Sequence, residues 1–482
     1  MNQLDDIRSD ALRLGQGRSD LIAGYLKPGE TIEGFGYGGS ESLTMFLRRG
    51  DGDLIVRKIL SERLVTPRWD RGGRGVMLPP HIKARRQMEF LRGLPPSVQP
   101  YFPLILDVSE RGHAPGAGDG AASGEPHEFV YDMSFVPGME VSQFVRKYRP
   151  APITVALLYA EIFRLLRERV HTHRRRMPRR PTLEASYFSK IEKRLALAAS
   201  TAPKTFNDQL LECDEIVLNG RKQRNVRALL KTLRENERYR EVLEPFFHSL
   251  VVGDTNTENV KIGNLEPLLQ AHAGRSVRDR PFTWEDLELR FLDPRAIGYH
   301  EDGVDTGADD PMYDNKPWHN SLGHYDLIHG EHFELEYRDT GDAGLPSLRI
   351  HFHEDNAYAD SYRGIGRYFA EVMTTAWHLD DPDSDVRRAD PYWLIRFAFL
   401  MGTHFLAMPP FHLGKTEDGE LIDDARYQRR PLAIYAEGIR WMNLALDMLE
   451  GRVQSYLGLP VPQIGEPPAA SDEYAPARLA VG

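Results

Sequence analysis

The chain has 482 residues, of which 41% are hydrophobic and 27% charged, which excludes a fibrous or a wholly disordered protein. Its formal net charge of −10 argues against a general nucleic-acid binder. The single cysteine, Cys213, excludes an internal disulfide and a cysteine-held zinc site, which fits a reducing cytoplasm. We also find no signal-peptide pattern at the start and no apolar run of about 18 residues, so we expect neither secretion nor a membrane span.

Residues 1–30 favour a short amphipathic helix followed by a turn. A glycine-rich turn then separates two strand-like runs, the second over 43–48, and contains Gly36, Gly38, Gly39 and Ser40. Glycines allow backbone N–H groups to approach a phosphate, although a bare structural hairpin is an equally good interpretation of this pattern.

Residues 54–60 read as a strand that carries Lys58 among apolar residues. A lysine in such a strand needs a polar partner for its ammonium, and a solvent-facing lysine on an edge strand is the alternative. The periodicity of 81–94 predicts a helix, in which Glu89 is the one acidic residue. Two more strands are expected over 101–108 and 128–135.

A polar loop between the apolar runs 250–252 and 260–262 holds Asp254 and, five residues later, Asn259. A second carboxylate, Asp293, follows the short strand-like run 291–292. Phosphoryl transfer from a nucleotide needs one carboxylate to orient the acceptor hydroxyl, and it needs hard oxygen ligands to hold Mg²⁺ on the phosphates. The spacing of these residues is typical of that chemistry.

This stretch resembles the catalytic and metal-binding loops of protein-kinase-like small-molecule phosphotransferases, the aminoglycoside and choline kinase group. It is most similar to the sugar or capsule-biosynthesis kinases of that group, on the runs Leu292-Asp293-Pro294-Arg295 and Asp310-Pro311-Met312-Tyr313-Asp314-Asn315-Lys316. One departure is that Val252 stands where the group usually has His. By the same resemblance, Asp314 is expected to support the catalytic loop.

The resemblance implies an α+β, two-lobed, protein-kinase-like fold with a small, mostly β N-terminal lobe and a larger, mostly helical C-terminal lobe. We expect an N-terminal helical extension over 1–30, a nucleotide-binding lobe over 31–136, a catalytic and acceptor-binding lobe over 137–460, and a disordered tail over 461–482.

The resemblance also implies roles for individual residues. Asp254 would position and deprotonate the acceptor hydroxyl, and Asn259 and Asp293 would bind Mg²⁺. Lys58, paired with Glu89, would hold the nucleotide phosphates, and a solvated Glu89 on the helix surface is the alternative.

Two further groups complete the expected nucleotide site. The loop of Gly36, Gly38, Gly39 and Ser40 would lie over the phosphates, and backbone groups near Asp132 and Ser134 would hold the base. The expected function is therefore transfer of the γ-phosphoryl group of ATP or GTP, with Mg²⁺, to a hydroxyl of a small molecule such as a sugar.

Two alternatives remain open on the sequence. A protein kinase is disfavoured because no Asp-Phe-Gly pattern stands at Asp293 and no Ala-Pro-Glu segment follows it. A nucleotide-binding scaffold without turnover is disfavoured because both carboxylates, the Asn and the Lys are all present. We expect a nucleotide and a small hydroxylated acceptor as partners, and no nucleic acid or membrane.

Overall fold

The computed structural model describes residues 22–36, 43–61, 80–111, 128–172, 182–245, 247–271, 276–295, 308–340, 344–376, 390–416 and 421–464. The chain forms two compact units. The first comprises Met1–Arg175 and His248–Asn320, and the second comprises Arg176–Phe247 and Ser321–Gly482. The first unit therefore combines the predicted nucleotide-binding lobe with the predicted catalytic loops.

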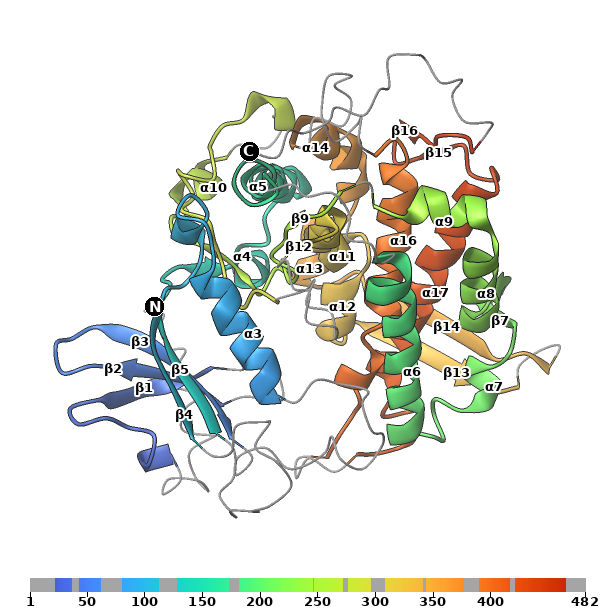
Figure 1. Ribbon diagram of the computed structural model, residues 1–482. Helices are drawn as coiled ribbons and strands as arrows, with labels where there is room; N and C mark the ends of the chain where they lie inside the picture. Colours follow the sequence, from blue (N-terminus) through green and yellow to red (C-terminus); the bar gives the residue numbers. More distant parts are fainter. Residues whose placement is uncertain are drawn as a thin grey trace, which may run out of the picture. The chain divides into compact units, whose positions relative to one another are not determined.

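A five-stranded antiparallel sheet dominates the start of the first unit, in the order β1-β2-β3-β5-β4 (Figure 1). Its strands are β1 (Thr31–Gly36), β2 (Leu43–Arg48), β3 (Leu54–Ser61), β4 (Ile105–Arg111) and β5 (Glu128–Ser134). Helix α3 (Pro80–Arg92) connects β3 to β4 and packs against β3 and β5. The strand and helix predictions over 43–48, 54–60, 81–94 and 128–135 are confirmed, whereas β4 begins four residues later than expected.

Alternation along the strands gives the sheet two different faces. Lys58 of β3 is in register with Tyr131 of β5, and the adjacent Arg57 is in register with Asp132, so each pair points to one side. On the Arg57 side, apolar residues of β1, β2 and β3 pack with Ile22 in one buried cluster. Residues 22–30 therefore cover the face opposite Lys58.

The rest of the first unit holds the two predicted functional loops between short strands and helices. Strand β10 pairs with β11 and β6, and β9 pairs with β12, so the two apolar runs around residue 254 do not pair with each other. Helix α5 is buried along almost its whole length. The elements are β6 (Met139–Glu140), α4 (Val141–Tyr148), α5 (Pro152–Leu165), β9 (Ser249–Leu250), β10 (Val260–Ile262), α10 (Glu266–Gln270), β11 (Arg290–Phe291), β12 (Ala308–Asp309) and α11 (Lys316–Ser321).

The second unit is built around two long helices, α16 (Trp393–Leu406) and α17 (Arg429–Leu449), which pack closely on each other. Gly402 and Gly438 permit this approach, because a Cβ atom at either position would lie within 3 Å of the facing helix. Its other helices are α6 (Ser189–Thr201), α7 (Asp208–Leu211), α8 (Val226–Glu235), α9 (Glu237–Leu243), α12 (Tyr325–His329), α13 (Ala357–Tyr362) and α14 (Phe369–Ala376).

A four-stranded sheet, in the order β13-β14-β7-β8, completes the second unit. Strands β13 and β14 pair antiparallel over six residues each as a hairpin. The strands of this unit are β7 (Glu215–Leu218), β8 (Arg221–Arg224), β13 (Phe333–Arg338), β14 (Ser347–Phe352), β15 (Ser455–Tyr456) and β16 (Leu459–Pro460).

The α+β, protein-kinase-like order of elements is therefore confirmed in the described residues: an antiparallel sheet with helix α3 between its third and fourth strands in the chain comes first, and a mostly helical region follows. Within the described ranges, no helix is long and apolar enough to cross a membrane.

Candidate active site

Asp314 fixes the loop that carries Asp254. Its carboxylate is fully buried and accepts the backbone N–H groups of Val252, at 2.8 Å, and Gly253, at 2.7 Å. Its backbone oxygen accepts the hydroxyl of Thr255 at 3.0 Å. Gly253 has a φ of 79°, a left-handed conformation that glycine adopts without strain. The predicted supporting role of Asp314 is confirmed.

A histidine also reaches this carboxylate, although none precedes Asp254 by two residues. Nε2 of His171 lies 2.9 Å from Oδ2 of Asp314, and both side chains are buried. His171 follows the helical turns that continue α5. The sequence has Val252, and no histidine, two residues before Asp254. The imidazole of His171, from a distant part of the chain, instead contacts the carboxylate of Asp314, which supports the loop.

Two cations hold the carboxylate of Asp254, which is 2% exposed. Nζ of Lys316 lies 2.6 Å from Oδ1, and Nε of Arg295 lies 2.7 Å from Oδ2. Nδ2 of Asn256 also donates to Oδ1 at 2.8 Å. Burial alone would raise the pKa of Asp254, but Arg295 and Lys316 outweigh it and hold this pKa below its ordinary value. Asp254 is therefore ionised and held in one orientation.

Asn259 ties the first loop to the second. Its Nδ2 donates to the backbone oxygen of Asp254 at 3.1 Å, and its own backbone oxygen accepts the N–H of Leu292 at 2.7 Å. A second backbone bond joins Arg295 N–H to the oxygen of Val252 at 2.9 Å. The two loops thus lie side by side, and Asp293 follows directly after a residue bonded to Asn259.

Asp293 is held from two sides. Its Oδ1 accepts hydrogen bonds from Nζ of Lys58, in an ion pair, and from Nε2 of Gln87 at 2.9 Å. Burial alone would raise the pKa of Asp293, but Lys58, Gln87 and Arg295 outweigh it and lower this pKa overall. Burial alone would lower the pKa of Lys58, but the charge of Asp293 outweighs it and leaves this pKa raised. The Asp293 side chain is still 42% exposed, so solvent screens part of this interaction.

The side-chain oxygens of Asn259 and Asp293 are suitable ligands for a magnesium ion. Both contacts of Asp293 use Oδ1, so Oδ2 has no partner among the described residues. The amide nitrogen of Asn259 is engaged with Asp254, which leaves the amide oxygen for a ligand. A carboxylate and an amide oxygen are ligands that Mg²⁺ prefers.

The predicted ion pair between Lys58 and Glu89 is wrong. The Glu89 side chain is exposed, and Lys58 pairs with Asp293 instead. The residue of α3 that faces the site is Gln87. Two residues along a helix are separated by roughly 200°, so the helix that turns Gln87 inward necessarily turns Glu89 outward.

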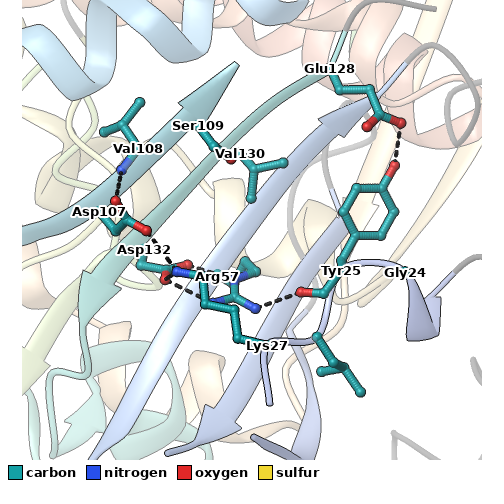
Figure 2. A pocket seen from close by; sticks show the side chains of 11 residues that line it. Gly24, Tyr25, Lys27, Arg57, Asp107, Val108, Ser109, Glu128, Val130 and Asp132 are labelled. Atoms are coloured by element: carbon teal, nitrogen blue, oxygen red, sulfur yellow. Dashed lines mark hydrogen bonds and ion pairs between the residues drawn. The ribbon is translucent and has the colours of Figure 1, made fainter. Parts of the chain in front are cut away.

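The side chain of Asp132 lies on the face of the sheet opposite Lys58, and the predicted contact of backbone groups near this residue with the nucleotide base stays a prediction. Figure 2 shows Asp132 beside Arg57 in a pocket between residues 22–30 and the sheet. Nε of Arg57 lies 2.6 Å from Oδ1 of Asp132, and the guanidinium also binds Glu30 at 2.6 and 2.8 Å. Lys27 joins Asp132 at 3.0 Å. This cluster anchors residues 22–30.

Ser134 is likewise committed to the sheet. Its backbone N–H donates to the oxygen of Leu104, and its Oγ accepts the N–H of the same residue, both at 2.9 Å. The backbone N–H of Ser134 is therefore already bonded within the sheet and is not available to donate to a nucleotide base. Of the glycine-rich turn, Gly36 ends β1, whereas Gly38, Gly39 and Ser40 lie outside the described residues, so their phosphate contact stays a prediction.

Three residues of the site have no role in the sequence-based assignment: Gln87, Arg295 and Lys316. Arg295 and Lys316 stand in the two runs that carry the family resemblance, which is the signal that marks them. Gln87 has no such signal, because only the phase of α3 distinguishes it from its polar neighbours. All three lie in the same compact unit as Lys58, Asp254 and Asp293.

Comparison with known proteins gives little further identification. No protein-family model matches the chain, and no curated protein matches it. Among solved structures, it is similar to an amicoumacin kinase in complex with AMP-PNP, Ca²⁺ and Ami, at 10% identity and a TM-score of 0.36, over 87% of this chain and 93% of that one. It is also similar to a MAP kinase from Leishmania major, at 11% identity and a TM-score of 0.22, over 40% and 62%. Nothing about the site is inferred from likenesses this distant.

Proposed function

We propose that this chain is a Mg²⁺-dependent phosphotransferase that moves the γ-phosphoryl group of ATP or GTP to a hydroxyl of a small molecule, such as a sugar or a sugar-containing metabolite. The observation that carries the proposal is the pair of joined loops in the first unit. These loops bring the oriented carboxylate of Asp254 next to Asn259 and Asp293, whose oxygens are of the type that binds Mg²⁺. Lys58 forms an ion pair with Asp293.

In this reaction the acceptor oxygen forms a bond to the γ-phosphorus, and the bond from that phosphorus to the β,γ-bridging oxygen breaks. The nucleoside diphosphate leaves with the electron pair, and the hydroxyl proton passes to Asp254. Mg²⁺ would supply positive charge on the phosphates when held by Asn259 and Asp293. Because the pKa of Asp254 is lowered, this carboxylate is a weak base. A weak base suits a loose transition state, in which positioning of the hydroxyl matters more than early removal of its proton.

Lys316 and Arg295 place two positive charges at the carboxylate that would receive the hydroxyl. They keep Asp254 ionised, and in the proposed reaction their charges would act on the negative charge that develops beside Asp254 during transfer. Preformed charge of this kind stabilises the transition state without reorganisation. The run that begins at Asp293 reads Asp-Pro-Arg and not the Asp-Phe-Gly of protein kinases, which supports a small-molecule acceptor over a protein acceptor.

Asp254→Asn tests the proposal. Turnover should fall by about 10²- to 10⁴-fold, the usual range for a lost general base. Binding of AMP-PNP with Mg²⁺, measured by calorimetry, should barely change, because Asp254 acts on the acceptor. The native chain would be screened against sugars, aminoglycosides and nucleosides. Nucleotide binding without transfer to any of them would favour a scaffold, and transfer only to proteins would favour a protein kinase.

A further inference from the structure

One glutamine side chain connects three elements around Asp293. Nε2 of Gln87 donates to Oδ1 of Asp293 at 2.9 Å and to the backbone oxygen of Pro294 at 2.7 Å. Its Oε1 accepts the hydroxyl of Tyr131 at 2.6 Å. The side chain thus joins α3 and β5 to the loop that would hold the metal.

An amide meets this set of partners better than a carboxylate does. Glutamine carries both a donor and an acceptor, whereas an ionised glutamate only accepts. The two partners on the loop, a carboxylate and a carbonyl, are acceptors, so they require a donor from α3. In protein kinases, a helical glutamate pairs with the strand lysine. Here Lys58 is paired with Asp293 itself, and a neutral residue takes the helical position.

The backbone of Asp293 shows why this loop needs a restraint. Its φ is 46°, in the left-handed region that L-residues other than glycine rarely adopt. Such a conformation persists where its surroundings over-determine it. Gln87 contacts the side chain of Asp293 and the carbonyl of the next residue, so it restrains the loop on both sides of the peptide that joins them.

We propose that Gln87 is the positioning residue of the metal loop, which orients the carboxylate of Asp293 so that its second oxygen is presented to the metal. This inference rests on the proposed function, since it concerns the metal of the same reaction. Tyr131 is the second part of the device, because its hydroxyl fixes which end of the Gln87 amide points at Asp293. The burial of Tyr131, at 1% exposure, keeps that hydroxyl in place.

A purely structural role for Gln87 makes a different prediction. If the side chain only fastened α3 to the loop, its loss would lower the melting temperature and leave metal affinity unchanged. Residues that orient a metal ligand change the affinity by roughly 10- to 100-fold when they are replaced. Metal affinity, measured without turnover, therefore separates the two roles.

The experiment uses the full chain with AMP-PNP and follows Mn²⁺ binding by electron paramagnetic resonance. For Gln87→Met, which keeps the length of the side chain but removes both hydrogen-bonding groups, the half-saturating Mn²⁺ concentration should rise by about 10-fold or more. Tyr131→Phe, which removes one hydroxyl, should raise it by a smaller factor. Glu89→Gln, on the exposed side of the same helix, should leave it unchanged. Melting temperatures without metal report the fold of each variant.

The outcomes separate this inference from the function on which it rests. If the native chain binds no Mn²⁺ with AMP-PNP, the proposed function fails and the role of Gln87 fails with it. If the native chain binds Mn²⁺ and Gln87→Met binds it equally well, only the role of Gln87 is overturned. Should Gln87→Met not fold, Tyr131→Phe decides, and an unchanged Mn²⁺ affinity in that variant overturns the inference.

Discussion

The ammonium of Lys316 lies 2.6 Å from Oδ1 of Asp254, a residue 62 positions earlier in the chain. Both side chains are buried, so the pair is shielded from the screening that weakens surface ion pairs. Arg295 holds the other oxygen of the same carboxylate. The orientation of the proposed base is therefore fixed by two positively charged side chains from other segments of the chain.

Replacing Lys316 by methionine should lower turnover by about 10²- to 10³-fold, the usual cost of one preformed donor at a reacting centre. The positive charge beside Asp254 would be halved, and the carboxylate would lose the contact that fixes Oδ1. The measurement is kcat and KM for the nucleotide in the acceptor assay. Lys222→Met, at an exposed strand position, is the matched control. Equal turnover in the two variants would contradict a role for Lys316.

Asp293→Asn should leave the fold intact and either raise the Mg²⁺ requirement steeply or abolish turnover, because a neutral amide balances less metal charge. It would also release Lys58 from its ion pair. Turnover as a function of Mg²⁺ concentration checks this prediction. Asp286→Asn changes an exposed carboxylate of the same unit and should behave as the native chain. Unchanged Mg²⁺ dependence in Asp293→Asn would remove the metal assignment.

Asp314→Ala should destabilise the chain by several kcal/mol, because the backbone N–H groups of Val252 and Gly253 would lose their acceptor at about 1–3 kcal/mol each. Urea denaturation with an intrinsic fluorescence signal measures this difference. Asp355→Ala, at an exposed position, should stay within about 0.5 kcal/mol of the native chain. A loss for Asp314→Ala as small as for this control would show that the loop does not depend on that carboxylate.

Local patterns predicted the strand bounds, since strand β2 has the bounds expected from its apolar run. The meeting of Asp254 and Asn259 with Asp293 was implied by the family resemblance and not by a local pattern. In the structure the first loop leads into β10, the second follows β11, and these two strands pair.

Side-chain directions are decided by tertiary packing, and the sequence did not predict them. The sequence shows Glu89 as the acidic residue of its helix, but the phase of α3 against the sheet selects Gln87. The side chain of Asp132 lies on the face opposite Lys58 because Asp132 is in register with Arg57, which no local pattern shows. Register and helix phase are set by partners far away in the chain.

The charged side chains of Arg57, Asp132, Glu30 and Lys27, on the face of the sheet opposite Lys58, predict how the stability of the chain depends on pH. Burial alone would raise the pKa of Asp132, but Arg57 and Lys27 outweigh it and hold the pKa below its ordinary value of 3.8. A carboxylate with a lower pKa in the folded state binds fewer protons there than in the unfolded state. Its contribution to stability is therefore fully present above about pH 4 and is lost as the pH falls through the folded-state pKa.

Asp132→Asn should thus change the stability in two ways. At pH 7 the variant should be less stable by about 1.5–3 kcal/mol, because the buried Arg57 would keep Glu30 but lose the charge of Asp132. Below pH 4 the native chain should lose this advantage, so the two stabilities should converge as the pH falls. The free energy of unfolding in urea, measured between pH 7 and pH 3, tests both parts. Asp107→Asn, at a half-exposed position that also contacts Lys27, should show only a small effect. Parallel pH curves for the native chain and Asp132→Asn would contradict the assignment, because a constant difference would mean that the carboxylate does not titrate differently in the folded and unfolded states.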